Sequence, residues 1–286
     1  MIATRYFDLH CDTPFECYRR KIALSYNTLA VNTGAERLFE IRKQCFAVWI
    51  RDDAENPYAL YQNILKDFKE KLKNCADNLT PILTVEGGAV IEDDIGRLYG
   101  LKEDKITAVT LTWNGQNKIA SGANAKGGLT EFGKSVIETM NDLGIACDLS
   151  HLNRESFFGA IRYAKYPIVT HTCCDAVNPH PRNLSDDALR LVAERGGVVG
   201  LCFYPVFLGG NDVFEAVWRH IYHILDIGLE DNLAIGSDFD GAEMEKPLSS
   251  ISDIPVLYSF LGQMGLDSSV LQKIFYKNAD NFFANL

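Results

Sequence analysis

Short apolar segments alternate with longer segments of helical periodicity along almost the whole chain. The short segments are rich in β-branched and aromatic residues, which is typical of buried strands. Eight of them predict strands, at residues 5–7, 44–50, 81–85, 106–112, 145–149, 167–170, 198–203 and 233–236.

The segments between these strands carry apolar residues three and four positions apart, as amphipathic helices do. The clearest example is residues 57–74, whose apolar face consists of Leu60, Ile64, Leu65, Phe68 and Leu72. Further helices are predicted at residues 130–143, 154–164, 186–195, 212–227, 254–264 and 268–283. Thr130 is suited to cap the first of these, and Gly144 to end it.

The regular alternation of strand and helix predicts parallel βα units. Eight such units in 286 residues fit a closed α/β fold, the (β/α)8 barrel of the TIM type, and an open doubly wound sheet is the alternative. No internal repeat or linker divides the sequence, and the glycine-rich segment 122–128 is too short to separate domains. We therefore expect one catalytic barrel domain over residues 1–286.

Composition narrows the classes of function. The formal net charge of −10 argues against a nucleic-acid or anionic membrane partner. The sequence has no signal segment at its start and no apolar run long enough for a bilayer, so we expect a cytoplasmic protein. The eight cysteines show no metal-binding or redox spacing, and most fall in apolar segments, which predicts reduced, buried thiols.

The polar residues after the first strand suggest metal chemistry. His10 and Asp12 lie two positions apart, so in an extended chain their side chains point the same way, and Cys11 points away. An imidazole and a carboxylate aimed at one point suit a divalent transition metal such as zinc. A core histidine beside a turn-forming aspartate would give the same short motif, so the pair alone does not distinguish a metal site from a structural role.

Similar residues follow other predicted strands. Glu86 follows the third strand, His151 the fifth, His171 the sixth and Asp238 the eighth. In a parallel barrel these strand ends share one face, where barrel enzymes hold their active sites. We therefore expect the potential ligands to converge on one mouth of the barrel.

The number of donors favours two metal ions. Three histidines, one aspartate and one glutamate exceed the ligands of a single four-coordinate zinc, and they match two ions that share a bridging carboxylate. Asp238 is then available for proton transfer, with a helix cap or loop brace as the alternative. Asp240 is interpreted as a loop brace. The other histidines are interpreted as structural, with His220 and His223 on the surface of an outer helix and His180 in a loop near the mouth.

These residues resemble a known family. The chain is similar to the membrane (renal) dipeptidase family of zinc peptidases, in particular its bacterial members. The matching segments are DLHCD (8–12), VEGG (85–88), LTWN (111–114), DLSH (148–151), THT (170–172), PRNLSD (181–186) and GSDFDG (236–241). They follow one another in order over essentially the whole chain.

The resemblance implies a role for each matching residue. His10 and Asp12 would bind the first zinc, His151 and His171 the second, and Glu86 would bridge the two ions. Asp238 would serve the leaving amine, and Arg182 would pair with the terminal carboxylate of the substrate. Many family members carry a histidine where this chain has Trp113, which would instead line the pocket. Tyr204 and Phe207, after the seventh strand, are candidates for a pocket wall.

The predicted function is hydrolysis of dipeptides by hydroxide that bridges two zinc ions or other divalent transition metals. Whether the C-terminal residue is a D-residue is left open. The alternatives are a hydrolase of the same fold that acts on another amide, a lactone or a phosphoester, and a catalytically silent family member. The expected partner is a small peptide substrate, and a homodimer is left open.

Overall fold

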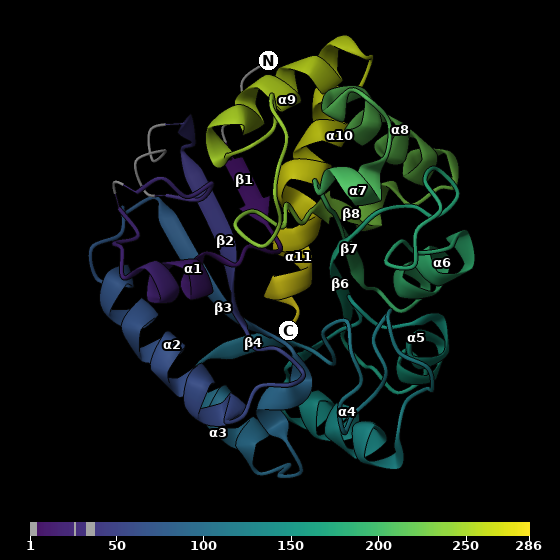
Figure 1. Ribbon diagram of the computed structural model, residues 1–286. Helices are drawn as coiled ribbons and strands as arrows, with labels where there is room; N and C mark the ends of the chain where they lie inside the picture. The colour runs from purple at the N-terminus through teal and green to yellow at the C-terminus, as the bar shows by residue number, and fades with distance from the viewer. Residues whose placement is uncertain (1–4, 26, 33–37) are drawn as a thin grey trace.

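The computed structural model of the protein describes residues 5–25, 27–32 and 38–286. Within these residues, eight parallel strands form a closed barrel in chain order (Figure 1). The strands are β1 (Arg5–Asp8), β2 (Ile41–Trp49), β3 (Leu79–Glu86), β4 (Ile106–Thr110), β5 (Ala146–Asp148), β6 (Pro167–Thr172), β7 (Val198–Leu201) and β8 (Leu233–Ile235). Asp8 closes the ring, because it pairs with Gln44 on β2 and Ile235 on β8.

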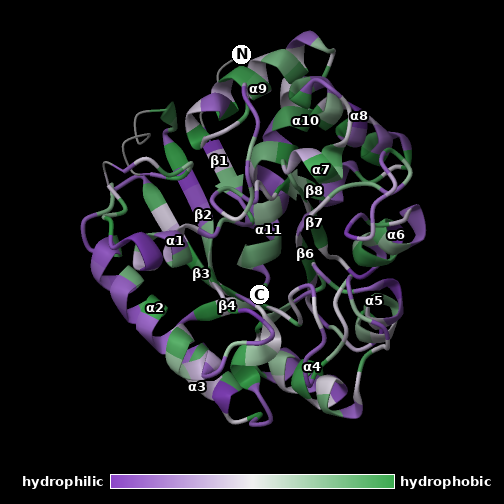
Figure 2. Ribbon diagram, in the orientation of Figure 1, coloured by the Kyte–Doolittle hydropathy of each residue, from purple (hydrophilic) through white to green (hydrophobic). Residues whose placement is uncertain are grey.

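Helices surround the barrel on the outside (Figure 1). The α-helices are α1 (Thr13–Arg20), α2 (Pro57–Leu72), α3 (Arg97–Glu103), α4 (Glu131–Leu143), α5 (Arg154–Ala160), α6 (Asp186–Glu194), α7 (Pro205–Leu208), α8 (Val213–Asp226), α9 (Ile254–Gln263), α10 (Ser268–Gln272) and α11 (Asn278–Ala284). Short 3₁₀ turns are η2 (Gly88–Ile91), η3 (Glu230–Asn232) and η4 (Ile251–Asp253), and η5 (Lys273–Lys277) is a π-helical turn. Figure 2 shows α2 with both hydrophilic and hydrophobic stretches, as expected for a helix that covers a barrel.

The prediction of a (β/α)8 barrel is confirmed, with differences at the ends of elements. Thr130 caps α4 by accepting a hydrogen bond from the Gly133 amide, and Gly144 ends it in the left-handed conformation. The helix predicted at 154–164 stops at Ala160, and the helix predicted at 268–283 is divided by the π turn. Helix α1 was not predicted, although Pro14 suits the first turn of a helix, where its missing N–H is not needed.

The barrel lumen has its own small core. It is made of one side chain from most strands, including Phe7, Ala108, Ile168 and Val198, and it is separate from the larger cluster between barrel and helices. The C-terminal segment closes the lumen at the end opposite the strand tips, since Phe283 packs on Phe7 with ring centroids 5.4 Å apart. The strand tips at the other end are therefore free to carry polar side chains.

The sequence predicts that His220 and His223 lie on the surface of an outer helix, and the structure tests both positions. His220 is not a surface group: it is buried on the inner side of α8, where it accepts a hydrogen bond from the Cys174 amide and contacts the Leu208 carbonyl oxygen at 2.9 Å. His223 is partly buried and contacts Asp186 at 2.8 Å. The interpretation failed for His220 because i, i+3 spacing does not reveal which helix face is covered.

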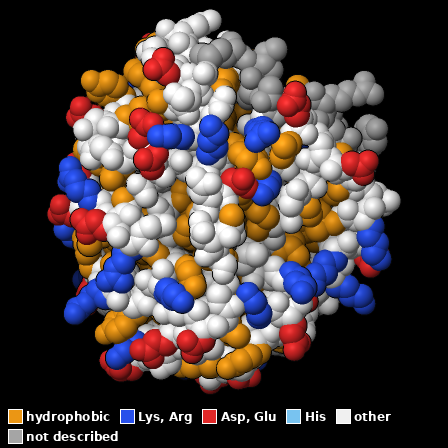
Figure 3. Space-filling view, turned by 180° about the vertical axis from the view of Figure 1, so that it is seen from behind, with side chains coloured by type: hydrophobic (Ala, Val, Ile, Leu, Met, Phe, Trp, Pro, Cys, Tyr) orange, Lys and Arg blue, Asp and Glu red, His pale blue; other side chains and the backbone are white. Residues whose placement is uncertain are grey.

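The remaining surface features are ordinary. Seven of the cysteines are buried, as predicted. On the face in Figure 3, basic and acidic side chains are interspersed with one another and with hydrophobic ones. In the part of the chain that the structure describes, no helix is both long and apolar enough to cross a bilayer.

Candidate metal centre

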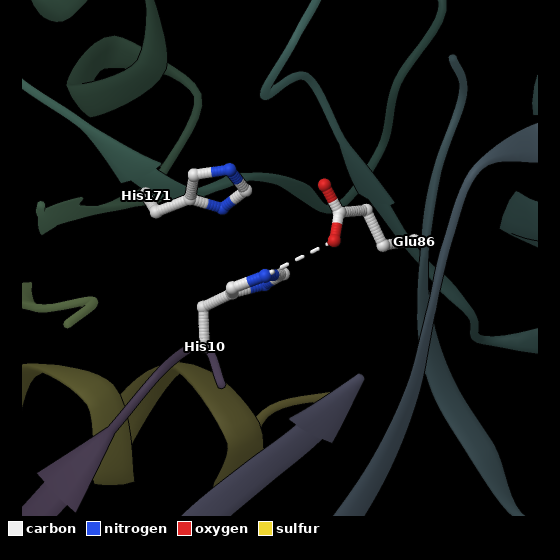
Figure 4. A group of neighbouring side chains, drawn as sticks. All are labelled: His10, Glu86 and His171. Carbon is white, nitrogen blue, oxygen red and sulfur yellow. Dashed lines mark ion pairs between the residues drawn. The ribbon is translucent and has the colours of Figure 1, made fainter. Parts of the chain in front are cut away.

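Side chains from separate strand ends meet at one mouth of the barrel. His10 follows β1, Glu86 ends β3 and His171 lies on β6, and their functional atoms point toward one another (Figure 4). His10 Nε2 lies 3.2 Å from Glu86 Oε2 and 3.3 Å from Asp12 Oδ2. His151 Nε2 lies 2.6 Å from the other oxygen of Glu86. The mouth therefore gathers nitrogen and oxygen donors from residues far apart in the sequence.

The remaining candidates join the same cluster. The Nε2 atoms of His151 and His171 lie 2.8 Å apart, and the rings of His10 and His171 are 4.0 Å apart. Asp238 Oδ1 lies 4.0 Å from His10 Nε2. The structure thus brings together all five predicted metal ligands and Asp238.

Local backbone geometry directs these side chains inward. As expected, Cys11 points away from its two neighbours and donates its thiol hydrogen to the Cys45 carbonyl. His151 and Asp238 adopt φ angles of 68° and 64°, which is uncommon for non-glycine residues and typical of functional sites. A side chain at Gly241 would place its Cβ 2.1 Å from Asp12 Oδ2 and would therefore displace the Asp12 carboxylate. The loops after β5 and β8 therefore hold strained conformations in order to aim polar groups at the cluster.

Hydrogen bonds behind the imidazoles fix how they face the cluster. His151 Nδ1 contacts Asn114 Oδ1 at 2.9 Å, and His171 Nδ1 contacts the Thr170 hydroxyl at 3.0 Å. When Nδ1–H donates to these oxygens, each Nε2 keeps its lone pair directed at the cluster. Histidine ligands of metal sites are usually oriented by such outer hydrogen bonds.

Asp148, which sequence reasoning did not identify, organises this outer layer. Its carboxylate accepts hydrogen bonds from the hydroxyls of Thr110 at 2.5 Å, Ser150 at 2.8 Å and Thr170 at 2.7 Å. Because Thr170 donates to Asp148, its oxygen is left to accept from His171. The position of Asp148 at the end of a predicted strand was the available signal, but the sequence does not separate a supporting carboxylate from a ligand.

The charges in the cluster are unbalanced without a cation. Burial and the charge of Asp12 raise the pKa of Glu86, and burial raises the pKa of Asp238. Burial lowers the pKa of His10, but the charges of Glu86 and Asp12 outweigh burial and raise it well above its usual value. A divalent cation would stabilise all of these carboxylates in their charged form.

The donor set fits a divalent transition metal. Burial lowers the pKa values of His151 and His171 well below the usual value for histidine, so both imidazoles are neutral, which is the form that binds metal. Two unprotonated nitrogens 2.8 Å apart would repel each other, and a cation between them removes that repulsion. Asp12 Oδ1 is buried without a hydrogen-bond partner among the described residues, as a ligand oxygen would be.

Arg182 lies beside the cluster with unused hydrogen-bonding capacity. Its Nη2 is 3.0 Å from His171 Nε2, and its guanidinium stacks over Phe207 at 5.3 Å. The buried Nε has no partner among the described residues. A buried guanidinium with a free donor suits an anionic ligand group.

A cavity of ≈ 530 Å³ opens over these groups. Its polar lining includes Asp12, Glu86, His151 and Asp238, and its aromatic lining consists of Phe15, Trp49, Trp113, Tyr204 and Phe207. The last three of these aromatic residues were predicted to line a substrate pocket, and they lie at the cavity. Phe15 and Trp49 were missed because they stand in segments whose apolar character is explained equally well by packing.

Asp240 and His180 form hydrogen bonds that stabilise the loops around the mouth of the barrel. Asp240 accepts hydrogen bonds from the Thr13 hydroxyl and the Ala30 amide, both at 2.7 Å, so it ties the β8 loop to the α1 region as expected. His180 accepts a hydrogen bond from the Arg182 amide at 3.1 Å, and its ring packs at a tilt against Phe207 with centroids 4.8 Å apart. The loop histidine thus supports the arginine rather than joining the metal cluster.

Known proteins are similar to this chain in sequence and in fold. A protein of Klebsiella pneumoniae encoded in the pqqA 5' region, itself uncharacterized, is 31% identical over 224 residues, which are 72% of this chain and 83% of that protein. A solved metallopeptidase of family M19, dipeptidase AC, superposes with a TM-score of 0.89 at 23% identity and covers 99% of this chain and 98% of its own. A metallopeptidase of Rhodobacter sphaeroides, solved with a phosphinate mimic of the dipeptide L-Ala-D-Ala, superposes with a TM-score of 0.88 at 23% identity, covering 99% of both chains. These two structures have the same barrel fold.

The family follows from the sequence match. The model of the membrane dipeptidase family, peptidase family M19, matches residues 1–283. The resemblance seen in the seven short motifs is therefore confirmed over nearly the whole chain. This protein belongs to the membrane dipeptidase family, peptidase family M19, and is a metal-dependent dipeptidase of the (β/α)8 barrel class.

Proposed function

We propose that the protein cleaves dipeptides with two divalent metal ions, and that zinc is the ion whose ligand preferences suit the donor set best. His10 and Asp12 would hold one ion, and His151 and His171 the other. Glu86 would bridge them. The observation that carries the proposal is the orientation of Glu86, whose Oε2 faces His10 at 3.2 Å while its Oε1 faces His151 at 2.6 Å.

Asp238 is the residue we assign to proton transfer. The bound ions would supply an activated water near neutral pH and a polarised scissile carbonyl. Asp238 Oδ2 accepts a hydrogen bond from the Cys202 thiol at 3.6 Å, which leaves Oδ1 directed at the cluster. Oδ1 would take the proton of the water and deliver it to the amine, which cannot leave as an anion.

Arg182 would hold the C-terminal carboxylate of the substrate. Its free buried Nε lies beside a second nitrogen, Nη2, which contacts His171 Nε2. When His171 Nε2 binds the ion, Nη2 would be free to donate to the substrate carboxylate. A charge-assisted contact of this kind selects dipeptides over longer peptides, because a longer peptide places its carboxylate elsewhere. Tyr204 and Phe207 would flank the C-terminal residue, since Phe207 lies under the guanidinium.

We further propose that a D-residue is accepted at the C-terminal position. The support is the likeness to the Rhodobacter sphaeroides metallopeptidase, which was solved with a mimic of L-Ala-D-Ala. Both the L and D forms of a C-terminal residue present the same carboxylate to Arg182, and they differ only in where the side chain points.

A substrate panel with metal analysis tests the proposal. The protein, purified with zinc, should contain two ions per chain and should hydrolyse L-Ala-L-Ala and L-Ala-D-Ala. It should leave the amide of the same dipeptide and the tripeptide largely intact, because neither places a carboxylate at Arg182. One ion per chain would refute the two-metal assignment. Equal cleavage of the amide and the free acid would refute the role of Arg182, and cleavage of lactones or phosphoesters alone would replace the proposed reaction.

A further inference from the structure

A row of aromatic rings leads away from the candidate metal cluster. Trp113 lies 6.4 Å from the ring of His151, Trp49 lies 5.2 Å from Trp113, and Phe15 lies 4.8 Å from Trp49, measured between ring centroids. The last two contacts are edge-to-face, the favourable geometry for aromatic pairs. All three rings of the row, Trp113, Trp49 and Phe15, are partly exposed and line the cavity.

The row and Arg182 touch the cluster through different residues. Arg182 reaches the cluster at His171, and His171 contacts His151 through the two Nε2 atoms. The aromatic row begins on His151. The order of contacts is therefore the guanidinium, the imidazoles of His171 and His151, and then the aromatic row that starts at Trp113.

The row is held in place by a carboxylate outside the cluster. Asp52, in the loop after β2, accepts hydrogen bonds from the backbone amides of Trp113 at 3.2 Å and Gly115 at 2.8 Å, and from the Asn117 side chain at 3.3 Å. These bonds join the loop after β2 to the loop after β4. Trp113 is therefore positioned before any ligand arrives, which lowers the entropic cost of binding against it.

The far end of the row borders a second cavity. This cavity has a volume of ≈ 660 Å³ and shares Phe15 and Trp49 with the first one. Its lining also includes the apolar residues Ala54, Ala59 and Leu60 and the polar residues Arg51, Glu55, Asn56 and Asn63. A side chain that lies along the row thus finds further space beyond Trp49, part of it apolar.

We propose that this aromatic row binds the side chain of the N-terminal residue of the substrate, and that it selects dipeptides in which this side chain is large and apolar, above all aromatic. The inference rests on the proposed function: a dipeptide with its carboxylate on Arg182 and its scissile bond at the cluster extends its N-terminal residue past His151. An aromatic side chain there would stack on Trp113 and Trp49, whereas alanine would leave both rings uncovered.

Hydrolysis of a series of dipeptides tests the inference. With alanine kept at the C-terminus, kcat/KM should be about tenfold to a hundredfold higher for N-terminal Phe than for N-terminal Ala, as expected for burying a large apolar side chain. In Trp49→Ala this preference should shrink to about threefold or less. Trp218→Ala is the matched control, because Trp218 lies on outer helix α8 against Tyr222 and does not line the cavity, and the preference should persist.

Binding of two phosphinate dipeptide mimics, one with a Phe-like and one with an Ala-like N-terminal side chain, gives a readout that does not depend on turnover. Tighter binding of the Phe-like mimic, lost in Trp49→Ala, supports the inference. Equal kcat/KM for N-terminal Phe and Ala in the unaltered protein, with dipeptides cleaved, overturns it and leaves the proposed function intact. Failure to cleave any dipeptide refutes the proposed function, and equal affinity for the two mimics then refutes the inference as well.

Discussion

Replacement of Thr170 by valine would show how far the outer hydrogen bonds control metal binding. Thr170 is buried, its hydroxyl donates to Asp148 at 2.7 Å, and it lies 3.0 Å from His171 Nδ1. Valine keeps the shape of the side chain and suits a strand, but it offers no hydrogen-bond acceptor. The substitution therefore removes the acceptor for His171 Nδ1, together with a longer contact to His10 Nδ1 at 3.5 Å, and leaves the proposed ligands in place.

The substitution should weaken metal binding, and it should also cost stability at Asp148. In Thr170→Val without metal, the His171 proton can move to Nε2 and donate to His151 Nε2, 2.8 Å away. Arg182 Nη2 then gives up its contact with His171. Metal binding forces the proton back to Nδ1, where it has no acceptor, and a buried unsatisfied donor costs about 1–3 kcal/mol. Zinc affinity should therefore fall about tenfold to a hundredfold, which is the usual effect of losing an outer hydrogen bond. The free energy of unfolding of the metal-free protein should fall by about 1–3 kcal/mol, because the buried Asp148 carboxylate loses the Thr170 hydroxyl as a donor.

Competition with a chromophoric zinc chelator measures the affinity, and urea unfolding of the metal-free protein measures stability. Thr170→Ser should bind zinc as the unaltered protein does, because it keeps the hydroxyl. Thr107→Val is the matched control, since Thr107 bonds the Leu83 carbonyl on β3 and not the cluster. Zinc affinity within about twofold of the unaltered protein in Thr170→Val would refute the assignment of His171 as a ligand supported through Nδ1.

Other predictions follow from single contacts. Asp238→Asn should keep the metal content while turnover falls at least about a hundredfold, and near-normal turnover would remove Asp238 from proton transfer. Arg182→Ala should raise KM for free dipeptides about tenfold to a hundredfold without loss of metal, and an unchanged KM would contradict carboxylate binding. Burial lowers the pKa of His220 to about 4, so the unfolded chain binds this proton first as pH falls; stability should be complete above about pH 6.5 and decline by up to about 3 kcal/mol towards pH 4. His220→Gln should flatten that decline in urea unfolding at each pH. Asp52→Ala should raise KM for dipeptides with N-terminal Phe about threefold to tenfold, whereas Asp53→Ala, whose residue is exposed and pairs with Arg51, should leave it unchanged.

The barrel could be predicted because long elements carry a clear pattern. Helix α2 has 16 residues and α4 has 13, enough turns for an apolar face to recur. Helices α3 and α7 have 7 and 4 residues, too few for periodicity to show, and neither was predicted. The π turn at Lys273–Lys277 leaves no mark in the sequence pattern, so one long helix was expected where three short elements occur.

The convergence of the ligands could also be predicted, because parallel strands in a barrel end at one face. The walls of the cavity could not. Trp49 is the last residue of β2, and an apolar residue there could face either the helices or the mouth. Its contact with Trp113 depends on a loop that Asp52 holds from 61 residues away, and no local pattern records such a pairing.

Hydrogen-bond donors separate two kinds of carboxylate that the sequence cannot tell apart. Asp8 and Asp148 both end strands, as Glu86 does, and both are buried. Asp8 accepts from the Ser237 amide at 2.8 Å and hydroxyl at 2.6 Å, and Asp148 accepts from three hydroxyls, so protein donors already satisfy their charge. Among the residues that the structure describes, the polar partners of the Glu86 carboxylate are His10 and His151, which are themselves candidate ligands, and Asp12 leaves one oxygen without a partner. A buried carboxylate without such donors is stable as an anion only beside a cation. We therefore expect an acidic residue at a strand end to be structural where hydroxyls and amides surround it, and to bind metal where such donors are missing.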